Sequence, residues 1–238
     1  YYGMDIYGRL ALPELLKELC KIDGIRWIRL MYCYEDKITD ELIDTMASEE
    51  KICHYIDIPI QHSSDRILKA MNRKSTKTSI MSTMSKLRAK MPDINIRTTL
   101  ITGFPGETEE DFDELYNFVS EMKFERLGIF AYSREEGTPA DKMKGHIRQD
   151  IKEKRRDSIM LMQTEISLSK NREKIGKTIE VIVDGKDDDG SYYGRSSYDA
   201  PEIDNAVLFT SEKELHEGDF INVKITDAFD YDLVGEAL

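Results

Sequence analysis

The residue types best suited to hold a ligand lie in the turn Gly103-Phe-Pro-Gly-Glu107, which separates an apolar stretch from an acidic one. The apolar, β-rich residues 94–101 predict a strand, and Thr108 with Asp111 has the spacing of a helix-capping box. A strand, a tight glycine turn and a helix N-terminus form a ligand site at the carboxyl edge of many parallel sheets. The local pattern alone is equally consistent with an ordinary βα turn.

A second polar group, Gln61, His62 and Ser63, follows another apolar run at residues 55–60. These side chains would lie at the same carboxyl edge and could hydrogen-bond a polar ligand. Their alternative role is to cap the short helix that begins at residues 64–65. With no companion histidine beside it, His62 is not predicted to bind a metal ion.

These segments belong to a series of helices and strands that alternate along the first part of the chain. Strands are predicted at residues 27–31, 55–60, 94–101 and 127–132, and helices at 13–23, 40–46, 65–71, 80–91 and 109–122. Strands that recur between helices imply parallel βα units. Four strands are too few to close an eight-stranded barrel, so we predict an α/β fold with a partial, truncated parallel β/α barrel.

The pattern changes after residue 147. A highly charged stretch at 148–175 predicts a helical connector, whose expected apolar side consists of Ile151, Ile159, Met162 and Ile166. In residues 176–238, five short apolar runs alternate with glycine- and proline-containing turns. They predict a small five-stranded antiparallel β-barrel of the oligonucleotide-binding type. The expected domains are therefore 1–147, 148–175 and 176–238.

Composition excludes several classes of protein. Hydrophobic residues make up 40% and charged residues 34% of the 238-residue chain, which indicates a globular fold able to bury a core. No apolar run is long enough to span a membrane, so no membrane partner is expected. The cysteines Cys20, Cys33 and Cys53 have no spacing typical of a disulfide framework or a zinc knuckle, and they indicate a reducing, cytoplasmic location.

The charge is unevenly distributed. Residues 176–238 hold sixteen Asp and Glu against five Lys and Arg, a net charge of −11 out of −12 for the whole chain. Such a field repels phosphate, so it disfavours nucleic acid and favours a basic partner. The alternative is that this acidic surface only keeps the protein soluble.

Three motifs occur in a fixed order: Ile58-Pro-Ile-Gln-His-Ser-Ser-Asp-Arg-Ile-Leu-Lys-Ala-Met-Asn-Arg73, Arg97-Thr-Thr-Leu-Ile-Thr-Gly-Phe-Pro-Gly-Glu-Thr108 and Ala131-Tyr-Ser-Arg-Glu-Glu-Gly-Thr-Pro139. Together they resemble the radical S-adenosylmethionine methylthiotransferases, and residues 176–238 resemble the TRAM domain of that family. The resemblance covers essentially the whole chain. The family has tRNA-modifying members and a member that modifies an aspartate of the twelfth protein of the small ribosomal subunit.

The acidic barrel and its run Arg195-Ser-Ser-Tyr-Asp-Ala-Pro-Glu-Ile-Asp204 resemble the ribosomal-protein-modifying member. This resemblance implies an enzyme that adds a methylthio group to the β-carbon of that aspartate. Arg195, Asp199, Glu202 and Asp204 are then the expected contacts with the basic ribosomal protein. A tRNA-adenosine methylthiotransferase, with tRNA as the partner, and a non-enzymatic module that binds the ribosomal protein are the alternatives.

The resemblance also implies S-adenosylmethionine as a cofactor. The candidate residues to bind it are Gln61, His62, Ser63, Arg97, Gly103, Glu107 and Arg134. Arg97 opens a strand and could meet the methionine carboxylate, and Gly103 would let the backbone approach the adenosine. Arg134 lies just beyond the last strand and could reach the same edge. A surface ion pair is the alternative for Arg97, and Glu107 could serve only the helix dipole.

The chain departs from the family in its cysteines. Members hold the radical-generating [4Fe–4S] cluster with a Cys-x-x-x-Cys-x-x-Cys motif, and a preceding domain carries a second cluster. No pair among the three cysteines has that spacing. Tyr1-Tyr-Gly3 resembles the family sequence just after the second barrel strand. We therefore expect a C-terminal fragment that is inactive by itself, from a parent protein with two clusters whose ligands lie outside this chain.

Overall fold

A computed structural model describes residues 1–238 and divides into two compact units. The first unit comprises Tyr1–Gln163 and the second Thr164–Leu238. The boundary falls inside one long helix, α6 (Gln149–Arg172), at the position of the predicted connector. None of the helices combines the length and the apolar composition needed to cross a membrane.

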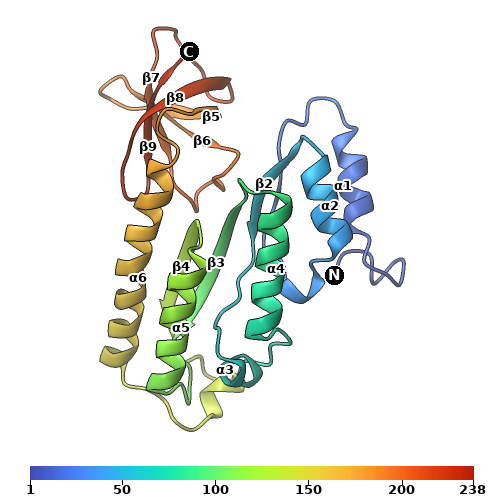
Figure 1. The fold of residues 1–238 in the computed structure, drawn as a ribbon, viewed down its shortest axis with the longest axis vertical. Coiled ribbons are helices and arrows are strands. Elements are labelled where there is room, and N and C mark those ends of the chain that lie inside the picture. The colour runs from blue at the N-terminus through green and yellow to red at the C-terminus, as the bar shows by residue number, and fades with distance from the viewer. The chain divides into compact units, whose positions relative to one another are not determined.

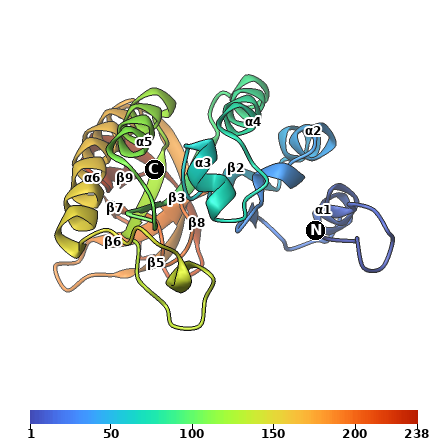
Figure 2. The ribbon, with the colours of Figure 1, turned by 90° about the horizontal axis from the view of Figure 1, so that it is seen from below.

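The first unit is built on a sheet of four parallel strands in the order β1-β2-β3-β4. The strands are β1 (Ile28–Leu30), β2 (Ile52–Asp57), β3 (Asn95–Thr102) and β4 (Arg126–Ala131). The helices are α1 (Leu12–Cys20), α2 (Asp40–Ser48), α3 (Asp65–Ala70), α4 (Lys77–Lys90) and α5 (Glu109–Met122), with short 3-10 helices η1 (Glu35–Lys37) and η2 (Ala140–Lys142). Figures 1 and 2 show α2, α4 and α5 along one face of this sheet. The predicted parallel βα units are confirmed.

Strand β3 shows how the sheet separates a covered face from a more open one. The buried residues Ile96, Thr98 and Leu100 alternate with the half-buried Arg97 and Thr99. This alternation is expected where helices cover one face of a strand. Because all four strands run parallel, the turns that follow their carboxyl ends meet at one edge of the sheet.

The bounds of β2 differ most from the prediction. The strand covers Ile52–Asp57, whereas residues 55–60 were expected. Pro59 has no N–H to donate, so regular pairing ends before it. Beyond the proline, a single parallel bridge joins Gln61 to Leu100 of β3. That bridge keeps the polar segment after β2 beside the end of β3.

Two predicted helix caps are confirmed. Thr39 Oγ1 accepts a hydrogen bond from Leu42 N–H at the start of α2. Thr108 Oγ1 accepts from Asp111 N–H at the start of α5, and Asp111 accepts from Thr108 N–H in return. These bonds satisfy N–H groups that have no partner within the helix.

Helix α6 buries a side that differs in part from the one its apolar residues predict. The buried positions repeat every three or four residues: Lys152, Arg155, Ile159, Gln163, Ser167 and Asn171. Ile159 is the only one of the four predicted apolar-side residues that is buried, and Ile151 is exposed. This stripe meets polar partners, because Lys152 and Gln163 donate to the carbonyls of Tyr132 and Phe124. Met162 and Ile166 are half-buried, so the predicted apolar side overlaps the buried side only in part.

The second unit contains a closed barrel of five strands in the order β5-β6-β7-β9-β8. The strands are β5 (Thr178–Lys186), β6 (Tyr192–Ser196), β7 (Val207–Thr210), β8 (Phe220–Ala228) and β9 (Leu233–Ala237). Every strand contributes buried apolar side chains to the core: Val181, Val183, Tyr192, Val207, Phe209, Val223, Ile225 and Leu233. The pair β7–β9 is parallel, so the barrel is not wholly antiparallel. The antiparallel hairpin with β8 sets the direction in which β9 runs beside β7.

Candidate functional site

The turn after β3 holds two glycines in the left-handed backbone region, Gly103 (φ +74°) and Gly106 (φ +85°). A Cβ atom on Gly103 would lie 2.0 Å from Lys152 Cγ, so the close approach that this glycine permits is to helix α6. A Cβ atom on Gly106 would have Arg66 Nη1 as its nearest neighbour, at 3.9 Å. The Gly106 N–H donates to the carbonyl of Gly145 at 2.9 Å, and Arg66 donates to the Gly106 carbonyl at 2.8 Å, so the turn is packed against the protein at both glycines.

A buried ionic cluster lies behind this turn. Glu107 Oε2 accepts the N–H of Gly103 at 2.8 Å, and Glu107 Oε1 accepts from Arg155 Nη1 at 2.7 Å. His62 Nε2 lies 3.4 Å from Glu107 Oε2, and both side chains are fully buried. His62 Nδ1 accepts the N–H of Ser64 at 2.9 Å, so the proton of the neutral ring is on Nε2 and faces Glu107. The cluster joins the end of β3, helix α6 and the segment after β2.

A second polar contact joins α3 to the start of α5. Asp111 accepts hydrogen bonds from the Ser64 hydroxyl at 2.7 Å, from the Thr108 N–H at 2.8 Å and from the Arg66 guanidinium. Burial by itself would raise the pKa of Asp111, but these hydrogen bonds outweigh it and hold that pKa well below its usual range. The ionised carboxylate therefore links the two helix starts that flank the turn.

The structure brings three of the predicted cofactor-binding residues, His62, Gly103 and Glu107, into one cluster. Gln61, immediately before them, adopts a positive φ of 72°. Ser63 is fully buried, and its hydroxyl has no hydrogen-bond partner within the protein. The segment after β2 therefore holds one buried hydroxyl whose hydrogen-bonding capacity is unused within the protein.

Arg97 and Arg134 lie outside that cluster. Arg97 is half-buried in β3, opposite Asp57 of β2, and its guanidinium nitrogens lie 3.9 Å from the position of the Cβ that Gly128 lacks. Arg134 is exposed and donates to both the carboxylate and the backbone carbonyl of Asp141. Arg134 would reach a ligand at the sheet edge only after this contact breaks.

Two residues of this region were missed in the sequence, Lys152 and Arg155, which are 8% and 7% exposed on α6. Lys152 Nζ donates to the carbonyl of Tyr132 at 2.6 Å, and Thr102 Oγ1 donates to the carbonyl of Lys152 at 3.1 Å. A charged run in a sequence favours a solvated helix face. The three-residue spacing of Lys152 and Arg155, which places them on one side of a helix, was the available signal. Only the position of Glu107 in the fold reveals that this side is buried.

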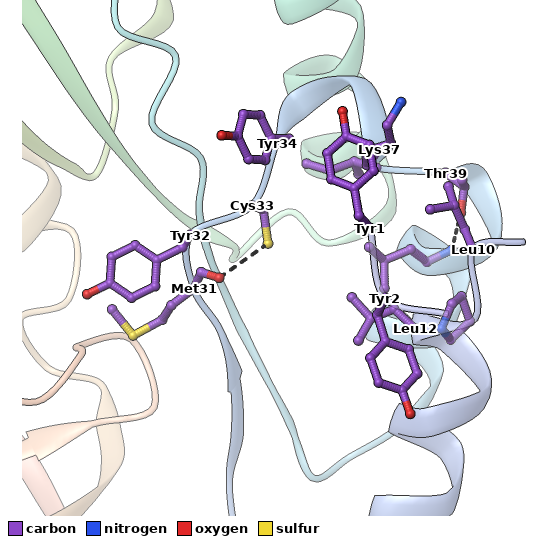
Figure 3. Close-up of a pocket in the computed structure, with 13 residues that line it drawn as sticks. Tyr1, Tyr2, Leu10, Leu12, Met31, Tyr32, Cys33, Tyr34, Lys37 and Thr39 are labelled. Atoms are coloured by element: carbon purple, nitrogen blue, oxygen red, sulfur yellow. Dashed lines mark hydrogen bonds between the residues drawn. The ribbon is translucent and has the colours of Figure 1, made fainter. Parts of the chain in front are cut away.

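A separate cavity of about 190 Å³ lies at the carboxyl end of β1 (Figure 3). Aromatic rings of Tyr1, Tyr2, Tyr32 and Tyr34 line it, together with Lys37. Tyr1 packs edge-on against Tyr34 with ring centroids 5.8 Å apart, and Lys37 Nζ lies 4.9 Å from the centroid of Tyr1. None of the predicted site residues lines this cavity.

The cysteines do not fit an iron–sulfur cluster. No three His, Cys, Asp or Glu side chains gather closely enough to hold a metal ion. Burial raises the pKa of the Cys33 thiol to about 11, with the charge of Asp57 acting in the same direction, and burial also raises the pKa of Cys53. Because iron binds the thiolate, these environments oppose the form that a cluster needs.

In the second unit, two predicted partner-binding residues accept hydrogen bonds within their own turn. Asp199 was expected to expose its carboxylate, but it is 1% exposed and accepts from the Ser196 hydroxyl at 2.6 Å. Asp204 accepts the N–H of Ala200 at 2.8 Å. Acceptors are needed there because the turn leaves N–H and hydroxyl groups unpaired, and burying such groups without a partner is costly.

The other two predicted partner-binding residues are more accessible. Arg195 is half-buried and pairs with Asp184 across β5 and β6, with Nη2 and Oδ1 3.0 Å apart. Glu202 is exposed and has a positive φ of 63°. Of the three carboxylates in this run, Glu202 is thus the one that a partner can reach without rearrangement.

Comparison with known proteins identifies the class to which each unit belongs. Residues 2–119 match the radical SAM superfamily, and residues 175–238 match the TRAM domain. Among solved structures, coproporphyrinogen III oxidase (HemN) from Escherichia coli, a radical SAM enzyme, aligns with a TM-score of 0.53. That alignment covers 78% of this chain and 48% of HemN at 15% identity, and it shows a likeness of fold alone. A radical SAM unit followed by a TRAM domain is therefore the class.

Full-chain relatives narrow this class to a family. Ribosomal protein uS12 methylthiotransferase RimO from Clostridioides difficile is 52% identical over 100% of this chain and 53% of its own length. The protein of the same name from Thermoanaerobacter sp. is 53% identical over 99% of this chain and 53% of its own length. The chain belongs to the radical SAM methylthiotransferase family, as its three motifs predict. It spans about half the length of the curated relatives it matches.

Proposed function

We propose that this chain is part of an S-adenosylmethionine-dependent methylthiotransferase that adds a methylthio group to the β-carbon of an aspartate in ribosomal protein uS12. The observation that carries the proposal is the identity of 50–54% with relatives named RimO along 98–100% of the chain. The alternative substrate class is a tRNA adenosine, since TRAM domains are of a nucleic-acid-binding type.

The site at the sheet edge fits S-adenosylmethionine as a cofactor. The glycine turn from Gly103 to Gly106 follows the carboxyl end of β3, and the buried Ser63 hydroxyl in the segment after β2 has no partner within the protein. We propose that the segment Gln61–Ser63, Arg97 and the turn from Gly103 to Glu107 hold the cofactor, with Arg134 released from its ion pair. When bound and given one electron by a reduced iron–sulfur cluster, S-adenosylmethionine would supply a radical able to abstract a hydrogen atom from the substrate. The chain's own residues bind and orient it.

Two [4Fe–4S] clusters complete the proposed enzyme, and their ligands are not among the cysteines of this chain. The single cysteines lie in separate environments and favour the thiol form. We therefore propose that residues 1–238 by themselves do not catalyse the reaction.

The second unit is the proposed docking site for the basic substrate protein. Its net charge of −11 in residues 176–238 opposes phosphate and attracts Lys- and Arg-rich surfaces. Exposed carboxylates steer a basic partner over a screening length of about 8 Å at physiological salt, so association should be fast and salt-sensitive. Glu202 is the accessible carboxylate of the run that resembles the family.

The decisive experiment is a modification assay with the natural full-length protein, reconstituted anaerobically. Incubation with S-adenosylmethionine, a one-electron reductant for the iron–sulfur clusters, a sulfur source and purified uS12 should add one methylthio group to one aspartate, read by peptide mass spectrometry. Bulk tRNA is the parallel substrate. Modification of tRNA adenosine with unmodified uS12 would replace the proposal by its alternative.

Docking is tested separately in the 238-residue chain by competition between uS12 and tRNA. The chain should bind uS12 and should not bind tRNA. Glu202→Gln should slow the association with uS12 modestly, since one exposed ion pair contributes at most about 1 kcal/mol. Asp199→Asn is the matched comparison, because its buried carboxylate should affect the stability of the turn rather than association. Binding of tRNA in preference to uS12 would contradict the docking proposal.

A further inference from the structure

We propose that Arg155 of helix α6 is a positioning residue for the cofactor turn, and that it acts through Glu107. The inference rests on the proposed function, in which the turn from Gly103 to Gly106 holds S-adenosylmethionine. It assigns a role in that site to a helix whose sequence pattern predicts only a charged connector.

The first observation is that both oxygens of Glu107 are used inside the protein. Oε1 receives Arg155 Nη1 at 2.7 Å, and Oε2 receives the Gly103 N–H at 2.8 Å. The Glu107 side chain is fully buried. A buried carboxylate without a compensating cation is strongly unfavourable, so Arg155 is what allows Glu107 to hold the Gly103 amide as a charged acceptor.

The second observation is that Arg155 is itself fixed in place. Its Nη2 donates to Glu109 Oε2 at 2.7 Å, and its guanidinium lies 5.3 Å from the ring centroid of Phe112. Burial opposes the charged form, but the hydrogen bonds and charges of Glu109 and Glu107 outweigh it and raise the pKa of the guanidinium. Arg155 thus bridges two carboxylates on either side of the α5 cap. The single ammonium of a lysine lacks the fork geometry for this bridge.

The third observation extends the contact to the other ligand-binding segment. His62 is fully buried and lies with Nε2 3.4 Å from Glu107 Oε2, while its Nδ1 is occupied by the Ser64 N–H. The ring can therefore face Glu107 only with its Nε2–H group. His62 Nε2 makes no hydrogen bond to Glu107 at this separation, so Arg155 acts through Glu107 on the turn after β3, and the segment Gln61–Ser63 only lies beside the same carboxylate.

The test compares Arg155→Met with Arg156→Met in the natural full-length protein. Arg156 is the next residue of α6, and its side chain is 37% exposed and pairs only with its neighbour Asp157. The dissociation constant for S-adenosylmethionine is measured by calorimetry at a temperature where circular dichroism shows every variant folded. Arg155→Met should weaken binding about tenfold, the scale typical of losing an outer-shell partner, and Arg156→Met should leave it unchanged.

A double-variant cycle shows whether the effect passes through Glu107. In a Glu107→Gln background, Arg155→Met should cause no further loss, and Arg155→Lys alone should retain intermediate affinity. Unchanged affinity in Arg155→Met, or full additivity with Glu107→Gln, would overturn the inference.

Failure of the proposed function gives a different result, because the unaltered protein would then not bind S-adenosylmethionine at all. Exchange of the Gly103 amide hydrogen in the 238-residue chain decides the role of Arg155 in that case. The amide should exchange faster in Arg155→Met than in Arg156→Met. Equal protection in the two variants would overturn the positioning role.

Discussion

Single polar side chains at this sheet edge make long-range hydrogen bonds that their sequence positions do not indicate. Asp111 is the third residue of α5, where an acidic residue is unremarkable. In the structure its carboxylate also binds Ser64 and Arg66, forty-five or more residues earlier in the chain. A local capping residue is thereby also a long-range link.

We predict that Asp111→Asn lowers the free energy of unfolding by about 2 kcal/mol at pH 7, because hydrogen bonds to a charged group are lost. The folded-state pKa of Asp111 is depressed, so its stabilisation is complete above the unfolded pKa of about 4 and is lost as the pH falls towards the folded value. The difference between wild type and variant should therefore shrink at pH 3. Urea unfolding at both pH values measures it, with the exposed Asp113→Asn as the control.

Gly103 offers a second prediction at the same scale. Gly103→Ala and Gly137→Ala both place a side chain at positive φ, which costs about 1–2 kcal/mol. Only at Gly103 does the new Cβ collide with Lys152, whereas nothing lies within 4 Å at Gly137. Overpacking should add about 1–3 kcal/mol to the loss at Gly103, measured by thermal unfolding. Equal losses in the two variants would show that Lys152 moves away without cost.

Among the elements, α6 differs most from what its sequence indicates. Its buried side carries Lys152, Arg155, Gln163 and Asn171, and each of these has a hydrogen-bond acceptor in its own unit. Hydrogen bonds of this kind offset part of the cost of burying polar side chains. The side that such a helix buries depends on where the carbonyl and carboxylate acceptors of its own unit lie.

We predict that Asn171→Ala lowers the free energy of unfolding of the second unit by about 2–3 kcal/mol. Asn171 is fully buried, and its Nδ2 donates to the carbonyls of Phe229 and Tyr231 in the turn between β8 and β9, so alanine removes two hydrogen bonds and leaves a cavity, although Asn205 still donates to the Tyr231 carbonyl. Arg172→Ala, at the next and exposed position, is the control. Near-wild-type stability of Asn171→Ala would indicate that water replaces the amide.

At the scale of the whole molecule, the two units differ in their charge and in the polar groups they present. The first unit, with almost balanced charge, supplies the polar edge of a parallel sheet, and the barrel carries nearly all of the negative charge. Neither unit gathers three side chains able to hold a metal ion.

We predict that anaerobic reconstitution with iron and sulfide leaves the 238-residue chain colourless, because its three cysteines are separate and burial raises the pKa of the half-buried Cys33 and the buried Cys53. Iron analysis and absorption spectroscopy measure the outcome, with the natural full-length protein as the positive control. Stoichiometric iron with a thiolate-to-iron absorption band would contradict the prediction.

The sequence by itself determined the elements whose signals are local. Alternating helices and strands, the Thr39 and Thr108 caps and the five strands of the barrel all follow from hydrophobic periodicity, capping residues and turns. The motif around Gly103 also predicted a turn at the sheet edge. These features are encoded within a few residues of one another, and so they can be recognised without knowledge of the fold.

Tertiary structure alone decided which charged groups are buried and what they contact. Arg155 and Glu107 lie forty-eight residues apart, so their pairing depends on the path of α6 past the end of β3. Gly103 is required by Lys152, and Asp199 is buried by its own turn. Charge and spacing indicate that a side chain is polar, but whether it faces water or a buried partner depends on how distant segments pack, because the cost of burial is removed only by that partner.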